Sequence, residues 1–182
     1  VLCVGVLAKP NARVPLGLLA LLTIGGLFAY FGQTYQTGAD PWQLFAVWAL
    51  LALPLCVSVR SDVLWAPWAL IVSTGVSLWV YAHTSHHWRV EQQDLPIYAV
   101  AWVMSLALTL GLSPAFARWS GSGIWAMRTA VTLTTITITT TALGALFDQE
   151  IALLYGLGVF LLAGAAAAMA TRSLFDIFGL SA

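Results

Sequence analysis

"DPWQLFAVWALLALPLCVSVRSD", residues 40–62, is the stretch that decides the fold. No charged residue lies between Asp40 and Arg60, and residues 42–59 form one long apolar run. A helix of about 20 residues crosses the hydrocarbon core of a bilayer. Asp40 fits a helix N-cap and Pro41 the first helical position. Gln43 fits the third helical position, where its side chain can hydrogen-bond back to the N-cap residue. The stretch therefore predicts a transmembrane helix over residues 42–59.

The composition of the whole chain agrees with this local prediction. Of its 182 residues, 60% are hydrophobic and only 8% are charged, whereas soluble domains carry about 25% charged residues. The formal net charge is zero, so there is no basic face of the kind that binds nucleic acid. Cys3 and Cys56 stand in apolar runs and are expected to be packing residues, not redox or disulfide partners.

Six stretches are apolar and long enough to span a membrane, and together they predict an all-α, polytopic transmembrane helical bundle with short loops. The predicted spans are residues 14–31, 42–59, 63–82, 96–113, 126–147 and 151–170. We treat residues 1–182 as one domain of a longer chain, with residues 1–8 ending a preceding span and residues 174–182 beginning a following one. Asp62 fits the N-cap of the third span.

The fifth span is unusual because threonine alternates with isoleucine in "RTAVTLTTITITTTALGALF", residues 128–147. In water this alternation would favour a β-strand. An isolated strand in lipid would leave its backbone polar groups unpaired, so we expect a helix. Its hydroxyl groups can donate to carbonyl groups one turn earlier, which hides their polarity.

The basic residues test the span assignment independently. When the connections are assigned alternately to two sides, one side holds Lys9, Arg13, Arg60, Arg118, Arg128 and Arg172. The other side holds Arg89 alone. This bias is the one expected of a multi-pass protein of the cytoplasmic membrane. It predicts that both ends of the chain lie near the cytoplasmic side, with the lipid bilayer as the main partner.

Two clusters of polar residues are candidate sites. Gln33, Tyr35 and Gln36, followed by Asp40, lie at the predicted outer mouth of the first two spans and can bind a ligand. Hydrogen bonding within the turn or between helices explains the same residues, and Asp40 is fully explained as a helix cap.

The second cluster contains histidines. His83 and His87 are four residues apart and would share a helix face, as zinc-binding pairs do, with Glu91 one turn further on. Solvated loop histidines are the alternative explanation. No other cofactor is predicted, and the chain carries no recognised catalytic motif, so we do not expect an enzyme.

The segment "GQTYQTGADPWQLFAVWALLALPLCVSVRSD", residues 32–62, resembles the bacterial predicted membrane proteins grouped as domain of unknown function 2157. The matching positions are Gln33, Tyr35, Gln36, Gly38, Asp40, Trp48, Pro54 and Arg60. The resemblance implies a longer protein of the bacterial inner membrane, and it implies no activity, cofactor or catalytic residue.

Three functions remain open. The first is a noncatalytic membrane module, or a subunit of an envelope assembly that contacts other membrane subunits or a second copy. The second is a transporter or small-molecule binder that uses the Gln33, Tyr35 and Gln36 mouth together with the threonines of the fifth span. The third is a metal-binding membrane protein that uses His83, His87 and Glu91.

Overall fold

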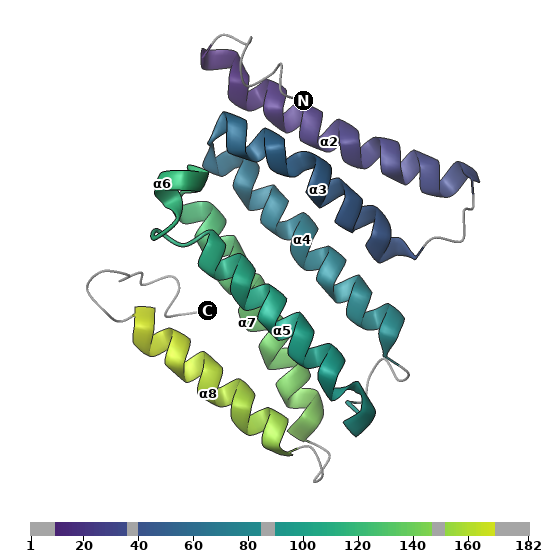
Figure 1. Ribbon diagram of the computed structural model, residues 1–182, viewed down its shortest axis with the longest axis vertical. Coiled ribbons are helices and arrows are strands. Elements are labelled where there is room, and N and C mark those ends of the chain that lie inside the picture. The colour runs from purple at the N-terminus through teal and green to yellow at the C-terminus, as the bar shows by residue number, and fades with distance from the viewer. Residues whose placement is uncertain (1–9, 36–39, 85–89, 147–151, 170–182) are drawn as a thin grey trace.

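The computed structural model describes residues 10–35, 40–84, 90–146 and 152–169, and in these ranges the chain is helical with no strand (Figure 1). The elements are α2 (Pro10–Tyr35), α3 (Pro41–Val59), α4 (Asp62–His83), η1 (Gln92–Asp94), α5 (Leu95–Gly111), α6 (Ala117–Ser120), α7 (Ile124–Leu146) and α8 (Ala152–Met169). The all-α prediction is confirmed for these residues, and the threonine-rich segment is a helix.

Four helices are long and apolar enough to cross a membrane, judged by length and composition over the described residues. They are Ala12–Thr34, Pro41–Val59, Asp62–His83 and Gln92–Gly111. The helix α7 is long enough, but its threonines and Arg128 dilute its hydropathy. In α8 the described apolar segment, Tyr155–Ala167, is short. Length and composition therefore support four of the six predicted crossings.

The helices pack as successive antiparallel neighbours, and α7 lies at the centre of the second half of the bundle. It contacts α4, α5 and α8, while α2 packs mainly on α3 (Figure 1). One buried cluster surrounds Leu55, Leu64 and Trp65, and another surrounds Trp102 and Ile138. Large apolar side chains also cover the outer surface, as expected of helices in lipid.

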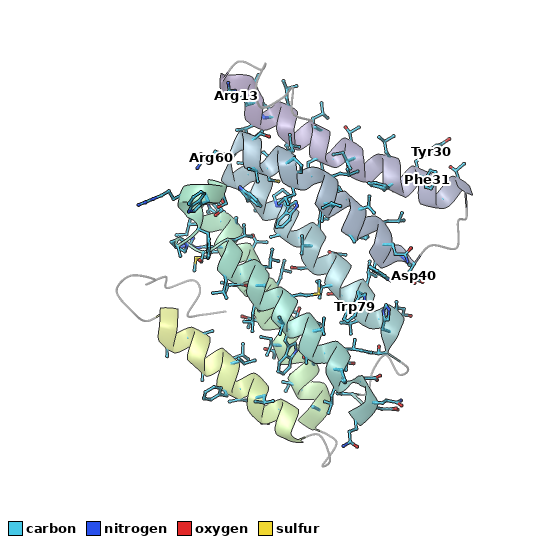
Figure 2. All side chains as sticks on the ribbon, viewed as in Figure 1. Arg13, Tyr30, Phe31, Asp40, Arg60 and Trp79 are labelled. Atoms are coloured by element: carbon cyan, nitrogen blue, oxygen red, sulfur yellow. The ribbon has the colours of Figure 1, made fainter. Side chains whose placement is uncertain are left out.

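Charged residues mark the two ends of the bundle. Arg13 and Arg60 lie at one end, which we call the arginine end, and Asp40 lies at the other, the aspartate end (Figure 2). Chain direction places the α4–α5 connection at the aspartate end and α6 at the arginine end (Figure 1). The Arg60 guanidinium donates a hydrogen bond to the carbonyl oxygen of Arg118, so these two basic residues share one end.

Three tryptophans connect neighbouring helices inside the bundle. The indole N–H of Trp48 donates to the Leu21 carbonyl at 3.0 Å, and that of Trp68 donates to the Ala49 carbonyl at 2.9 Å. The indole N–H of Trp102 donates to Oγ1 of Thr141 at 2.8 Å. Each bond joins two different helices, so a polar atom inside the bundle is satisfied and a helix pair is fixed together.

The threonines of α7 behave in two ways. Those at positions 129, 132, 137, 140 and 141 donate to the carbonyl group four residues earlier, as predicted from the sequence. Thr134 instead donates to the Ser105 carbonyl of α5 at 3.0 Å, and its Oγ1 lies 2.8 Å from that of Thr109. Most hydroxyl groups of α7 are thus satisfied within the helix, and those of Thr134 and Thr141 also bond to α5.

At the arginine end, the prediction that Asp62 is the N-cap of the third span is wrong. Ser61 is the N-cap of α4, and Asp62 is the first residue of that helix. The Asp62 carboxylate accepts hydrogen bonds from the backbone N–H groups of Gly123, Trp125 and Ala126 at 3.0, 2.8 and 2.8 Å. Asp62 therefore caps α7, a helix that begins about sixty residues later, and not its own helix.

Candidate functional site

A cavity of about 380 Å³ lies between α4, α5 and α7 toward the aspartate end of the bundle. Hydroxyl groups dominate its polar lining, and none of its described lining residues is charged. It is lined by Ser77, Val80, Tyr81, Thr84, Val90, Tyr98, Ala101, Ile136, Thr137, Thr140, Thr141 and Gly144. Three of the threonines that the sequence singled out as a candidate binding face therefore meet in one cavity.

These hydroxyl groups present acceptors to the cavity. Ser77 donates its proton to the Ser73 carbonyl at 3.0 Å, Thr137 to Leu133 at 2.9 Å, and Thr140 to Ile136 at 2.8 Å. A hydroxyl group has one proton to donate and two lone pairs. Because the protons are used within the helices, the groups have acceptor capacity left for a bound molecule.

Asp94 lies beside this cavity and is the residue that sequence reasoning missed. Its side chain is only 3% exposed, and Oδ2 has no hydrogen-bond partner among the described residues. It occupies the N-cap position of α5 but makes no side-chain capping bond. Its charge acts on the neighbouring Tyr98, whose side chain lines the cavity. A buried carboxylate that neither caps nor pairs is a functional-site candidate.

The sequence around Asp94 favoured a different interpretation. Asp-Leu-Pro at the start of an apolar run is typical of an exposed helix cap. Its burial depends on how η1 and the first turn of α5 pack in the folded chain. The sequence near Asp94 does not predict how these elements pack.

The predicted polar mouth at the end of α2 does not belong to this cavity. Gln33 is exposed near the end of α2 and is not among the cavity residues. Tyr35 is the last residue of that helix, and Gln36 lies outside the described residues. Ligand binding at this mouth therefore stays a prediction.

Asp40 lies where the sequence predicted, at the N-cap of α3 with Pro41 at the first position. The Gln43 N–H donates to the Asp40 carbonyl oxygen at 3.0 Å, while the Asp40 carboxylate makes no capping bond. The helix start is thus confirmed, and the side-chain cap is not formed.

The predicted metal ligands are only partly described. Nδ1 of His83 lies 2.8 Å from the Trp79 carbonyl oxygen, which leaves Nε2 as its remaining ring nitrogen. Glu91 accepts a hydrogen bond from the Gln93 side chain at 2.7 Å. No group of three potential metal ligands occurs among the described residues, and His87 lies outside them. Metal binding by His83, His87 and Glu91 stays a prediction.

Comparison with known proteins agrees with the resemblance noted in the sequence. A family model described as "Predicted membrane protein (DUF2157)" matches residues 4–65. No curated protein and no solved structure matches the chain. The matched residues include α2, α3 and the first turn of α4, so the cavity and Asp94 lie beyond the matched segment.

Proposed function

We propose that this chain is a noncatalytic, small-molecule-binding domain of a longer bacterial inner-membrane protein and crosses the bilayer six times. The six-span arrangement is supported by the grouping of basic residues: Arg13, Arg60 and Arg118 share the arginine end, while Asp40 lies at the other. In the positive-inside pattern, the arginine end faces the cytoplasm.

The orientation is testable by labelling single cysteines from outside the cell. Gln93 and Ala115 are exposed positions on the two sides of α5. In a background without the native cysteines, we expect Gln93→Cys to react with a membrane-impermeant maleimide on intact spheroplasts. Ala115→Cys should react only after the membrane is opened. Equal labelling of both positions on intact spheroplasts would reject the orientation.

The binding function rests on one observation: acceptor-rich hydroxyl groups line a cavity beside Asp94, whose buried Oδ2 has no hydrogen-bond partner among the described residues. A molecule that enters must supply hydrogen-bond donors, because most of the lining hydroxyl protons are already used. The nearby negative charge favours a positive ligand in a low-dielectric environment. The ligand class that fits best is a small amine or another compact cation that carries N–H groups.

Thermal unfolding in detergent tests this ligand class. We expect butylamine to raise the unfolding temperature more than butyrate or butanol, which match its chain length but lack its positive charge and its N–H donors. Tyr98→Phe, which removes a cavity hydroxyl group beside Asp94, should reduce that difference. Tyr30→Phe is the matched control, since Tyr30 is exposed on α2 and does not line this cavity. Equal shifts with amine and carboxylate would contradict the proposal.

A second candidate is a purely structural subunit of an envelope assembly. Contacts at the arginine end favour it: the Trp65 indole donates to the Ser120 carbonyl at 2.9 Å, and the Asp62 carboxylate caps α7. These bonds hold α4, α6 and α7 together without any ligand. This alternative predicts a fixed partner that co-purifies from the native membrane, together with no response to butylamine.

A further inference from the structure

Trp42 differs from the other tryptophans that pack within the bundle. The indole N–H groups of Trp48, Trp65, Trp68 and Trp102 all donate to protein oxygen atoms. The indole nitrogen of Trp42 is buried and has no hydrogen-bond partner among the described residues. Leaving such a donor unpaired in an apolar environment is unfavourable. The position is therefore one where an added acceptor would be stabilising.

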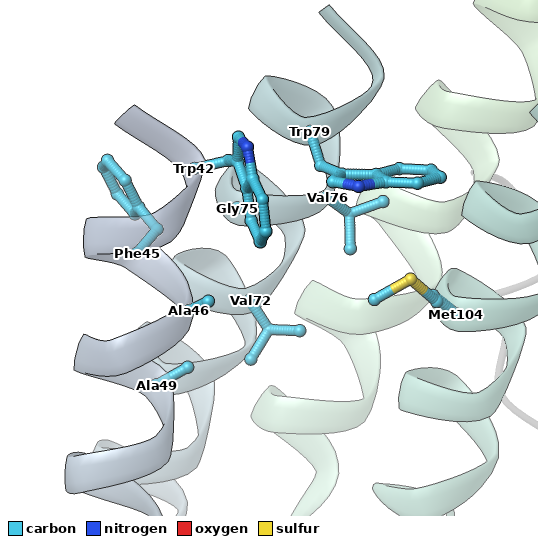
Figure 3. Close-up of a pocket in the computed structure, with 9 residues that line it drawn as sticks. All are labelled: Trp42, Phe45, Ala46, Ala49, Val72, Gly75, Val76, Trp79 and Met104. Atoms are coloured by element: carbon cyan, nitrogen blue, oxygen red, sulfur yellow. The ribbon is translucent and has the colours of Figure 1, made fainter. Parts of the chain in front are cut away.

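An apolar cavity adjoins this donor. It has a volume of about 190 Å³ and is lined by Trp42, Phe45, Ala46, Ala49, Val72, Gly75, Val76, Trp79 and Met104 (Figure 3). Small residues create the space, namely Ala46 and Ala49 on α3 and Gly75 on α4. From Trp42 to Ala49 the groove follows two helical turns, about 10 Å. Its volume is much smaller than that of a helix of the same length, whose diameter with side chains is about 10–12 Å.

The groove begins beside two tryptophans, a residue type that is enriched where a bilayer changes from headgroups to hydrocarbon. Trp42 is the second residue of α3, and Trp79 lies in the last turns of α4, so both rings lie toward the aspartate end. From the two indoles the groove runs past Ala46 and Ala49 toward the middle of the helices (Figure 3).

We propose that this groove, which we call the Trp42 groove, binds one acyl chain of a diacyl glycerolipid from the adjoining leaflet. The ester carbonyl at the top of the chain accepts the hydrogen bond of Trp42 Nε1, and the first methylene groups lie against Ala46, Ala49 and Val72. His83 packs edge-on against Trp42 with ring centroids 6.0 Å apart. To admit the carbonyl oxygen, the exposed His83 ring turns aside and gives up its contact with the Trp79 carbonyl oxygen.

The experiment compares an ester lipid with an ether lipid. Purified protein in detergent is titrated with dioleoyl phosphatidylethanolamine or with its dialkyl ether analogue, and bound lipid is counted by native mass spectrometry. The ether analogue has the same headgroup and chain length but lacks the carbonyl acceptor. We expect one retained lipid and about fivefold tighter retention of the ester, the effect of one neutral hydrogen bond.

Two variants assign the site. Trp42→Phe keeps an aromatic ring but removes the N–H, so it should abolish the preference for ester over ether. Ala46→Leu should fill the groove and release the retained lipid. Val47→Leu adds bulk at an exposed neighbouring position that does not line the groove and should leave retention unchanged.

Three results would overturn the proposal: equal retention of ester and ether by the unmodified protein, an ester preference that survives Trp42→Phe, or lipid retained by Ala46→Leu. The unfolding temperature of each variant, compared with that of Val47→Leu, separates loss of the groove from loss of the fold. The response to butylamine concerns a different cavity, so the two proposals succeed or fail separately.

Discussion

At the scale of single residues, Asp62 shows how much one carboxylate can organise. Its two oxygen atoms accept three backbone N–H groups at the start of α7. The first N–H groups of a helix have no partners within the helix, and a negative charge there is favourable. A residue at the beginning of α4 thus completes a helix that lies far away in the sequence.

We expect Asp62→Ala to lower the free energy of unfolding by about 1–2 kcal/mol, the typical contribution of a helix cap. Asp40→Ala is the control, because the Asp40 side chain makes no capping bond and its loss should matter little. The measurement is thermal or denaturant unfolding in a mild detergent. Equal losses for the two variants would show that the contacts of Asp62 with α7 are unimportant.

Gly123 provides a second prediction about the same contact. A Cβ atom at this position would lie 2.7 Å from Asp62 Oδ2, and the neighbouring carboxylate carbon is equally crowded. We therefore expect Gly123→Ala to destabilise the protein, and its effect should not add to that of Asp62→Ala. Gly26→Ala, inside α2 where no atom lies within 4 Å, should stabilise by about 0.5–1 kcal/mol instead.

At the scale of helices, α7 is the least apolar of the long segments, and it packs against α4, α5 and α8. Thr134 reaches α5 through the Ser105 carbonyl and Thr109, while Gly158 of α8 lies close to Ala142 and Trp102. In lipid, helix association relies on close packing and interhelical hydrogen bonds. The threonines and small residues of α7 therefore have the composition that a central helix requires.

Thr134→Val should destabilise the bundle by about 1 kcal/mol, since it keeps the shape of the side chain but loses the bonds to α5. Thr129→Val is the matched control, because Thr129 bonds only to the Trp125 carbonyl of its own helix. Unfolding in detergent measures both variants. A control that destabilises as much as Thr134→Val would indicate that loss of any α7 hydroxyl group is sufficient.

Sequence reasoning predicted the helices well and their neighbours poorly. The length of each apolar run predicted its helix, and Asp40–Pro41 marked the start of α3. The contacts of Asp62 and the burial of Asp94 could not be predicted in this way. Since the spans are apolar on all sides, their periodicity does not reveal which face meets which helix. The contacts of Asp62 and the burial of Asp94 both depend on which helix faces pack together.

At the scale of the whole molecule, the bundle is held by contacts between its two halves. The helix α4 packs against both α5 and α7, and the buried cluster around Leu64 includes Leu108, Ala126 and Ala130 from the second half. The two halves of the chain therefore share one core. Neither half can bury its apolar face fully by itself.

This arrangement predicts that the chain can be divided and reassembled. Residues 1–87 and 88–182, expressed together as two polypeptides with a tag on the first, should co-purify in detergent. Asp62→Ala should weaken their association, and Asp40→Ala should not. If the tagged half purified alone while both halves were present in the membrane, the shared core would be too weak to hold the bundle.

The capping of α7 by Asp62 also bears on biosynthesis. A polytopic chain enters the membrane from its N-terminus onward, so α4 is already in place when the threonine-rich α7 leaves the ribosome. The Asp62 carboxylate of α4 can then accept hydrogen bonds from the first backbone N–H groups of α7. The threonine-rich α7 is less apolar than the other long helices, so it partitions into lipid less favourably by itself. We expect α7 to insert into the bilayer when it is synthesised after α4. When it is fused to an unrelated leader sequence without α4, we expect it not to insert. Glycosylation mapping would measure insertion in both cases. Order of synthesis would then be part of how this sequence encodes its shape.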